Sequence, residues 1–296
     1  MSLIHTLEFI AHHPMNKGHE AAALMRFFRW QIGSRILQKS VVYEWMPGVR
    51  VIIRRSEMAM TQNLYCGLCD FADMAFVLHT MTPQDLFVDV GANSGPYTLL
   101  ACGAMGSRGY CFEPVPSTFH RLLDNLSING LQSRVTALNR GLCDRETELI
   151  FTVGQDCGNH VLADNEAGKA SVRVQVCTLD SVLSSESPSM LKIDVEGYET
   201  KVLDGANETL AKPSLNSIIM ELNGFGRRYG FDEETILQRM RDYDFRTYLY
   251  DPFRRELRAI EGKNISDSNT LFLRDVDTIK EKLAHAPHVT VGLTEL

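Results

Sequence analysis

The sequence lacks an excess of basic residues, long apolar runs and paired metal-binding motifs. Its 296 residues include 30 Lys and Arg against 37 Asp and Glu, which gives a net charge of −7. This balance argues against broad binding of nucleic acid or anionic membranes, since both need a basic surface. No apolar run reaches the roughly 18 residues that a membrane span needs, and no apolar core follows a basic start at the N-terminus. We therefore expect a cytoplasmic protein without nucleic-acid or membrane partners.

The seven cysteines do not form a recognisable framework. Their odd number and their scatter along the chain favour reduced thiols rather than disulfides. Cys66 and Cys69 form one C-x-x-C pair, but no second pair and no pair of histidines follows at the spacing that zinc sites use. We therefore expect neither a metal nor a redox role for this pair.

What the sequence does contain is an alternation of strand-like and helix-like segments from residue 86 onward. The expected strands cover 86–90, 109–113, 134–139, 190–195 and 217–222, and the expected helices cover 96–105, 117–128, 198–210 and 232–241. Such alternation predicts a mostly parallel sheet with helices on both faces, an α/β fold. Segments 148–153 and 171–176 are predicted to be antiparallel strands. The last two strands, 245–250 and 269–274, lack a clear helix between them and are predicted to pair as a hairpin at one edge.

The residues before this region form a separate pattern. A helix is predicted over 20–39, a β-hairpin over 41–53 around Pro47-Gly48, and a second helix over 68–79. We therefore divide the chain into an N-terminal extension (1–80), a main domain (81–275) and a C-terminal tail (276–296). The extension could cover the main domain or form a homodimer interface.

The stretch FVDVGANSGPYTLL, residues 87–100, indicates a ligand-binding turn between a strand and a helix. Gly91 lets the backbone bend tightly and pass close to a ligand. Gly95 removes a side chain where the helix begins, and a helix N-terminus offers free N–H groups. Glu113 ends the next strand, and a carboxylate there can accept two hydrogen bonds from a ribose diol. Together these features predict a nucleoside-containing cofactor.

The spacing and charge of the turn favour a cofactor without phosphate. The pattern is G-x-x-x-G rather than the G-x-G-x-x-G of nicotinamide sites, and Asp89 precedes it. A carboxylate there would repel a pyrophosphate but would suit the ammonium and sulfonium groups of S-adenosylmethionine. A nicotinamide-dependent oxidoreductase remains the alternative enzyme, and an ordinary turn flanked by surface acids is the structural alternative.

A second group of acids is predicted at neighbouring strand ends. Asp194 and Glu196 are two residues apart in the sequence, so their side chains are expected on the same face of the strand end. Lys192, two residues before Asp194, is expected on that face as well. Glu221 and Asn223 end the next core strand in the same way. Three readings stay open: a general base for a hydroxyl, a holder of substrate donors, or a metal pair. The structural alternative is a cluster tied to helix N-termini.

These motifs together resemble the FkbM family of S-adenosylmethionine-dependent methyltransferases over roughly residues 84–275. The matching segments are DVGANSGPYTLLA, FEP at 112–114, TLD at 178–180, LKIDVEGYE, IIMELN and SNTLFL at 268–273. The resemblance implies a seven-stranded, Rossmann-like class I methyltransferase sheet whose last strand is antiparallel. It also implies O-methylation of a hydroxyl on a sugar or natural product. A cofactor-binding module without turnover remains an alternative.

The resemblance also assigns roles to residues. Adenine contacts should come from the turn 140–143, which includes Leu142, with Asp144 as the nearest acid. The expected cofactor-binding residues are Asp89, Gly91, Asn93, Gly95, Glu113, Leu142 and Asp194. The catalytic candidates are Asp194, Glu196 and His160, a histidine of the loop GNHVL that could reach the site. We assign no metal ligands, although a divalent metal on Asp194 and Glu221 is a rival way to activate a hydroxyl.

Overall fold

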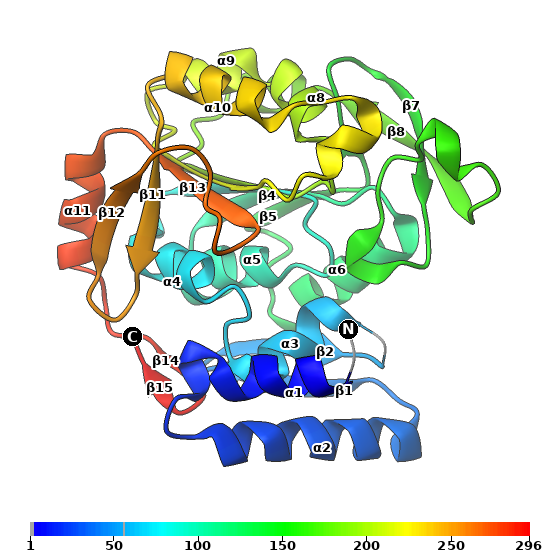
Figure 1. The fold of residues 1–296 in the computed structure, drawn as a ribbon, viewed down its shortest axis with the longest axis vertical. Coiled ribbons are helices and arrows are strands. Elements are labelled where there is room, and N and C mark those ends of the chain that lie inside the picture. Colours follow the sequence, from blue (N-terminus) through cyan, green and yellow to red (C-terminus); the bar gives the residue numbers. More distant parts are fainter. Residues whose placement is uncertain (1–2, 56) are drawn as a thin grey trace.

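The central sheet of the computed structural model has eight strands within the described residues, 3–55 and 57–296. The strand order is β12-β11-β13-β10-β9-β3-β4-β5 (Figure 1). The bounds are β3 (Leu86–Val90), β4 (Arg108–Phe112), β5 (Val135–Leu138), β9 (Met190–Ile193), β10 (Ser217–Glu221), β11 (Arg246–Asp251), β12 (Glu256–Ile260) and β13 (Asn269–Leu273). From β5 to β10 all neighbours pair parallel, whereas β13 runs antiparallel to β10 and β11. The mostly parallel sheet with an antiparallel last core strand is therefore confirmed.

The edge of this sheet differs from the prediction. β13 pairs with β11 as expected, but it lies between β10 and β11 rather than at the edge. The outer position belongs to β12, which pairs antiparallel with β11 and was not predicted. Its sequence ELRAI is exposed or half-buried throughout, so it has no buried apolar run that would indicate a strand.

Successive side chains along each strand point to opposite faces of the sheet, so both faces of a buried sheet are apolar. Helices cover both faces. Phe87 packs into one core, whereas Val88 and Val90 pack into the other. One face carries α7 (Leu179–Leu183), α8 (Glu199–Asp204), α9 (Asn207–Ala211) and α10 (Glu233–Asp242). The other carries α4 (Phe71–Thr80), α5 (Pro96–Thr98) with its π-helical continuation η2 (Leu99–Ala104), α6 (Pro116–Ile128) and α11 (Val276–Ala284) (Figure 1).

A smaller three-stranded sheet flanks the central one. It consists of β6 (Gly141–Leu142), β7 (Thr147–Thr152) and β8 (Ser171–Cys177). β7 and β8 pair antiparallel, as predicted. The loop between them contains the short helices η3 (Asp156–Gly158) and η4 (Asp164–Glu166). This loop brings residues 156–159 over the carboxyl ends of the central strands.

The N-terminal residues form a layer against α6, at the bottom of Figure 1. The layer contains α1 (Leu3–His12), η1 (Pro14–Asn16), α2 (Glu20–Leu37), β1 (Val41–Met46), β2 (Val49–Ile53) and α3 (Met58–Cys66). The predicted hairpin is present and docks on α6, where the Ile52 N–H donates to Asn125 Oδ1 at 2.8 Å. Helix α4, which we assigned to the extension, packs on the sheet. His79 of this helix forms a hydrogen bond with the Tyr250 hydroxyl of β11.

Residues 276–296, expected only as a tail, are folded. They form α11 and a small hairpin of β14 (Thr290–Val291) and β15 (Thr294–Glu295). Val291 and Leu296 are buried, and the Thr294 hydroxyl donates to the Met15 carbonyl at 3.1 Å. The C-terminal segment therefore ties the N-terminal layer to the sheet. None of the helices in the described part of the chain has the length and apolar character needed to cross a membrane.

Candidate active site

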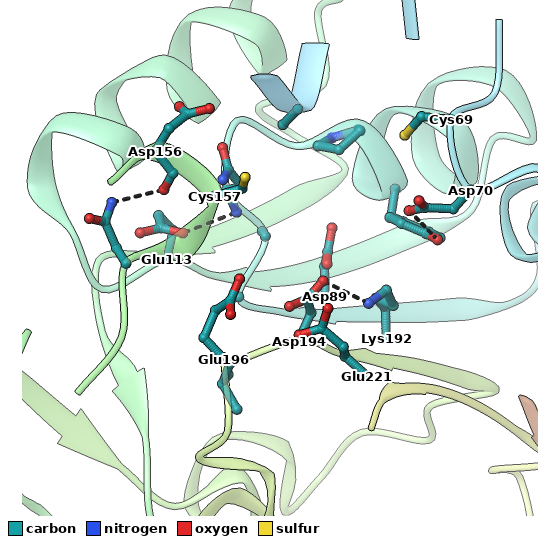
Figure 2. Close-up of a pocket in the computed structure, with 18 of the residues that line it drawn as sticks. Cys69, Asp70, Asp89, Glu113, Asp156, Cys157, Lys192, Asp194, Glu196 and Glu221 are labelled. Carbon is teal, nitrogen blue, oxygen red and sulfur yellow. Dashed lines mark hydrogen bonds and ion pairs between the residues drawn. The ribbon is translucent and has the colours of Figure 1, made fainter. Parts of the chain in front are cut away.

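A cavity of about 240 Å³ lies at the carboxyl ends of β3, β4, β9 and β10. This is where open α/β sheets bind ligands, because the strand order reverses between β3 and β9. Figure 2 shows acids around it: Glu113 and Asp156 at one end, Glu196 between, and Asp194, Glu221 and Asp70 toward the other. The structure thus brings the turn after β3 together with both groups of strand-end acids.

The turn after β3 has the geometry that its glycines predict. Gly91 has a φ of +81°, and a Cβ there would lie 1.8 Å from the carbonyl oxygen of Asp194. Only glycine fits this close approach of two strand ends. Asn93 has a φ of +51°, and its Oδ1 accepts the Ser94 N–H at 2.7 Å. A Cβ on Gly95 would meet Leu122 of α6 at 2.6 Å, so Gly95 serves helix packing.

Glu113 is held in place by the turn that it faces. Its Oε2 accepts the Asn93 N–H at 3.0 Å and its Oε1 accepts the Val115 N–H at 2.9 Å. Burial raises the pKa of Glu113 to about 7, against the two backbone hydrogen bonds that lower it. Each carboxylate oxygen keeps a second lone pair for a ligand hydroxyl.

Asp89 has a structural task that the sequence analysis did not assign. It lines the cavity, but its Oδ2 accepts the Thr98 N–H at 3.0 Å and the Thr98 hydroxyl at 2.6 Å. It thereby fixes the first turn of the helix that follows the ligand-binding loop. Burial raises the pKa of Asp89 to about 6, although both hydrogen bonds act in the other direction.

Three carboxylates meet at the ends of β9 and β10. One oxygen each from Asp194, Glu196 and Glu221 lies within 4.8 Å of the others. Lys192, which is 1% exposed, donates to Asp194 Oδ2 at 3.0 Å and to Asn269 Oδ1 at 3.2 Å. The predicted compensation of strand-end acids by Lys192 is present in the structure.

Two of the three carboxylates, Glu196 and Glu221, have a raised proton affinity. Burial first, and then the charge of Asp194, raise the pKa of Glu196 to about 7. The same two causes raise the pKa of Glu221 well above the ordinary glutamate range, and its Oε2 is buried without a partner. Asp194 has the ammonium of Lys192 at 3.0 Å. We therefore expect a protonated Glu221 and a titrating Glu196 near neutral pH.

Glu199, which is not among the predicted site residues, organises this loop. Its Oε1 accepts the N–H groups of Val195 and Gly197 at 3.2 and 3.1 Å. Gly197 has a φ of +102°, and a Cβ there would lie 2.6 Å from the Phe225 backbone. The E-G-x-E spacing in VEGYE could have indicated this role of Glu199, because a glutamate just after a glycine turn can accept hydrogen bonds from the free N–H groups of that turn.

Other cavity residues come from segments outside the predicted strand ends. Cys69 and Asp70 precede α4, and the Tyr97 hydroxyl donates to Asp70 Oδ2 at 3.0 Å. Asp156 and Asn159 belong to the loop between β7 and β8. No local pattern marked these residues, because only the tertiary fold places them over the strand ends.

His160 does not line the cavity. It is 4% exposed, and its two ring nitrogens lie 2.8 Å from the Gly158 carbonyl oxygen and 2.8 Å from Glu166 Oε2. The ring therefore anchors the loop that carries Asn159. We remove His160 from the catalytic candidates because both nitrogens have partners away from the site.

Leu142 lies beside a smaller cavity of about 20 Å³ that shares Gly91 and Val195 with the main one. The small cavity is also lined by Phe151 and Tyr198, so its walls are largely apolar. Asp144, by contrast, pairs with Lys201 at 2.8 Å and does not line either cavity. The expected turn thus reaches the site through Leu142 rather than through an acid.

The family model described as the methyltransferase FkbM domain matches residues 89–247. The chain belongs to the FkbM methyltransferase family. The match covers the ligand-binding turn, Glu113 and all three clustered carboxylates.

Two curated relatives share this region. The chain is 27% identical over 150 residues to the hexuronic acid methyltransferase AglP of Haloferax volcanii, covering 50% of this chain and 59% of the relative. It is 27% identical over 172 residues to the methyltransferase sdnD of Sordaria araneosa, covering 47% of this chain and 66% of the relative. The matches thus span less than two thirds of either relative.

Solved structures show only a distant likeness. An S-adenosylmethionine-dependent O-methyltransferase from Thermotoga maritima has a TM-score of 0.38 and 13% identity, covering 69% of this chain and 63% of its own. A Streptococcus mutans structure in complex with S-adenosylhomocysteine has a TM-score of 0.42 and 10% identity, covering 69% and 96%.

Proposed function

We propose that this FkbM-family protein transfers the methyl group of S-adenosylmethionine to a hydroxyl oxygen of a sugar or another natural product. The observation that carries the proposal is one cavity that joins the turn after β3 and Glu113 to the carboxylates of Asp194, Glu196 and Glu221. The family match supports methyl transfer. The choice of a hydroxyl rests on the base that the carboxylates offer.

The residues present fit this cofactor. Glu113 would accept the ribose hydroxyls, and Gly91 and Asn93 would border the methionine and ribose part. The apolar side chains of Leu142, Phe151 and Tyr198 would border the adenine. The acids around the turn favour a cation and disfavour a pyrophosphate, which argues against a nicotinamide cofactor. When bound, S-adenosylmethionine supplies a methyl group that is already activated by its positive sulfur.

Glu196 is our candidate general base. An alcohol must lose its proton as its oxygen attacks, and a base is most effective when its pKa lies near the working pH. Of the three carboxylates, Glu196 has its pKa raised to about 7. Asp194 holds Lys192, and Glu221 retains a proton, so these two would orient the acceptor hydroxyl rather than take its proton.

Lys192 makes a divalent metal a weaker explanation for the cluster. The buried ammonium already supplies a positive charge against Asp194. Burial acts to lower the pKa of Lys192, but the charge of Asp194 holds it above the ordinary value. Methyl transfer that persists in a strong chelator would reject the metal alternative. Transfer that stops in chelator and returns with Mg²⁺ would establish it.

A labelled-methyl assay tests the proposal directly. Purified protein is incubated with methyl-labelled S-adenosylmethionine and a panel of hydroxyl-bearing sugars and natural products. We expect label on at least one hydroxyl, with Glu196→Gln reducing the rate while cofactor affinity stays within threefold of the parent. Thermal stabilisation by NAD(P) instead of S-adenosylmethionine would favour the oxidoreductase, and cofactor binding without any transfer would favour a binding module.

A homodimer stays a prediction. Helix α2 exposes apolar side chains at helical spacing, namely Met25, Phe28, Ile32 and Ile36. This face is the surface that such a dimer would use. Sedimentation analysis should then show a dimer that Ile32→Glu dissociates, and a monomer at all concentrations would reject it.

A further inference from the structure

Acidic side chains dominate the lining of the site cavity. Seven carboxylates line it, and Lys192 is the single cationic side chain among the described residues of the lining. Such an imbalance selects among ligands by charge, because a buried charge needs an opposite charge or hydrogen-bond donors.

Four of the seven carboxylates already have strong partners. Asp89 and Glu113 accept the hydrogen bonds described above. Asp156 Oδ1 accepts from the Arg121 guanidinium at 3.2 Å. Asp194 pairs with the buried ammonium. Asp156 and Asp194 are thus balanced by ion pairs, and Asp89 and Glu113 are held in place by neutral hydrogen-bond donors.

The remaining three, Asp70, Glu196 and Glu221, have no ion pair within 4.0 Å in the described part of the chain. Asp70 accepts one hydrogen bond, from the Tyr97 hydroxyl, and Glu221 Oε2 is buried without a partner. In Figure 2 Asp70 and Glu221 lie toward the end of the cavity away from Glu113, and Glu196 lies between the two ends. Asp70 and Glu196 therefore offer acceptor oxygens to a ligand, whereas the ammonium of Lys192 is already engaged by Asp194 and Asn269.

The arginines near the site do not change this balance. Arg227 and Arg228 follow β10 closely in the sequence, but neither lines the cavity. The Arg228 guanidinium lies 4.7 Å from the Phe225 ring centre and 5.9 Å from that of Tyr229. Its charge lowers the pKa of Glu196, yet the net shift of Glu196 is upward. The described residues of the cavity lining therefore offer no arginine fork to a carboxylate or phosphate.

We propose that the acceptor is an uncharged or amine-bearing polyhydroxyl compound, and that acceptors with a carboxylate or phosphate are rejected at Asp70 and Glu196. This inference rests on the proposed function. Hydroxyl and ammonium groups donate hydrogen bonds to the carboxylates that lack partners, whereas an anion would lose its water beside them without a counter-charge. The hexuronic acid in the name of the AglP relative therefore does not predict the acceptor of this chain.

Galactose and two derivatives that each differ from it in one group test the proposal. The protein is first saturated with S-adenosylhomocysteine at pH 7.5, with saturation checked by calorimetry. The binding of galactosamine, galactose and galacturonate is then compared by saturation-transfer NMR. We expect galactosamine or galactose to bind at least tenfold more tightly than galacturonate. Equal binding, no binding of any sugar, or a preference for galacturonate would overturn the charge selection.

Variants assign the selection to its residues. Asp70→Asn keeps an oxygen for the Tyr97 hydroxyl, and Glu196→Gln keeps the shape of the side chain. Each should narrow the ratio between galactosamine and galacturonate at least threefold, while the control Glu234→Gln on the exposed face of α10 should not. Unchanged ratios in both variants would contradict the assignment. Failure of S-adenosylhomocysteine to bind the parent protein would instead refute the proposed function.

Discussion

Replacement of Lys192 by methionine probes the charge balance on which the site depends. Lys192 is 1% exposed, and its ammonium contacts Asp194 at 3.0 Å and Asn269 at 3.2 Å. It also lies 5.2 Å from the ring centre of Tyr97. Methionine keeps the length and apolar stem of the side chain, so the variant removes mainly the charge.

The expected cost follows from the carboxylates left behind. Removal of one partner of a buried ion pair typically costs about 3–5 kcal/mol, because the other charge stays buried without compensation. For Lys192→Met we expect a loss in this range at pH 7.5. Carboxylates with a raised folded-state pKa favour folding at low pH and lose that contribution as pH rises through the folded value. Since Glu196 has a pKa raised to about 7, the cost should shrink at pH 5.

Urea unfolding of both proteins at pH 7.5 and pH 5 measures this difference. The control is Lys169→Met, because Lys169 pairs with Glu166 on the surface and such pairs contribute about 0–1 kcal/mol. The double variant Lys192→Met/Asp194→Asn should recover part of the loss. A Lys192→Met cost below about 1 kcal/mol, or the same cost at both pH values, would refute the reasoning.

Three further outcomes follow from the geometry. Gly91→Ala should abolish cofactor binding or folding, because its Cβ would lie 1.8 Å from the carbonyl oxygen of Asp194. The control Gly33→Ala should be tolerated, because a Cβ there meets nothing within 4 Å. Calorimetry measures cofactor binding by each variant, and circular dichroism shows whether each is folded. Glu196→Gln should lower kcat by about 10²–10⁴ and remove a rise in rate near pH 7, and an unchanged pH profile would exclude it as the base. Burial raises the pKa of Glu199 to about 7, so thermal stability without ligand should fall as pH rises from 5 to 8, and a rise would contradict this.

The sequence predicted the parts of the fold that depend on local pattern. Buried apolar segments such as 86–90 and 217–222 are the core strands, and the alternation with helices predicts a parallel sheet. The edge was harder to predict. β12 is polar and half-exposed, and the position of β13 inside the sheet depends on long-range pairing that no local pattern encodes.

The same distinction between local pattern and long-range structure applies to the residues of the candidate site. Gly91, Glu113 and Asp194 line the cavity, and the sequence could indicate this because turn chemistry and strand ends place them at one edge of the sheet. Asp70 and Asn159 were missed because they reach the cavity from distant segments. His160 was included because a loop histidine has no sequence signal that separates a free ring from one held by Glu166. Asp89 shows a double role that only its contacts with Thr98 reveal.

Calorimetric titration of S-adenosylhomocysteine into the parent protein and Glu113→Gln tests the central claim most directly. Hydrogen bonds to charged groups contribute about 1.5–3 kcal/mol, so we predict saturable binding at one site per chain that Glu113→Gln weakens by roughly tenfold or more, with Glu234→Gln unchanged. No binding to the parent protein, or equal affinity in Glu113→Gln, would contradict the assignment of this cavity to the cofactor.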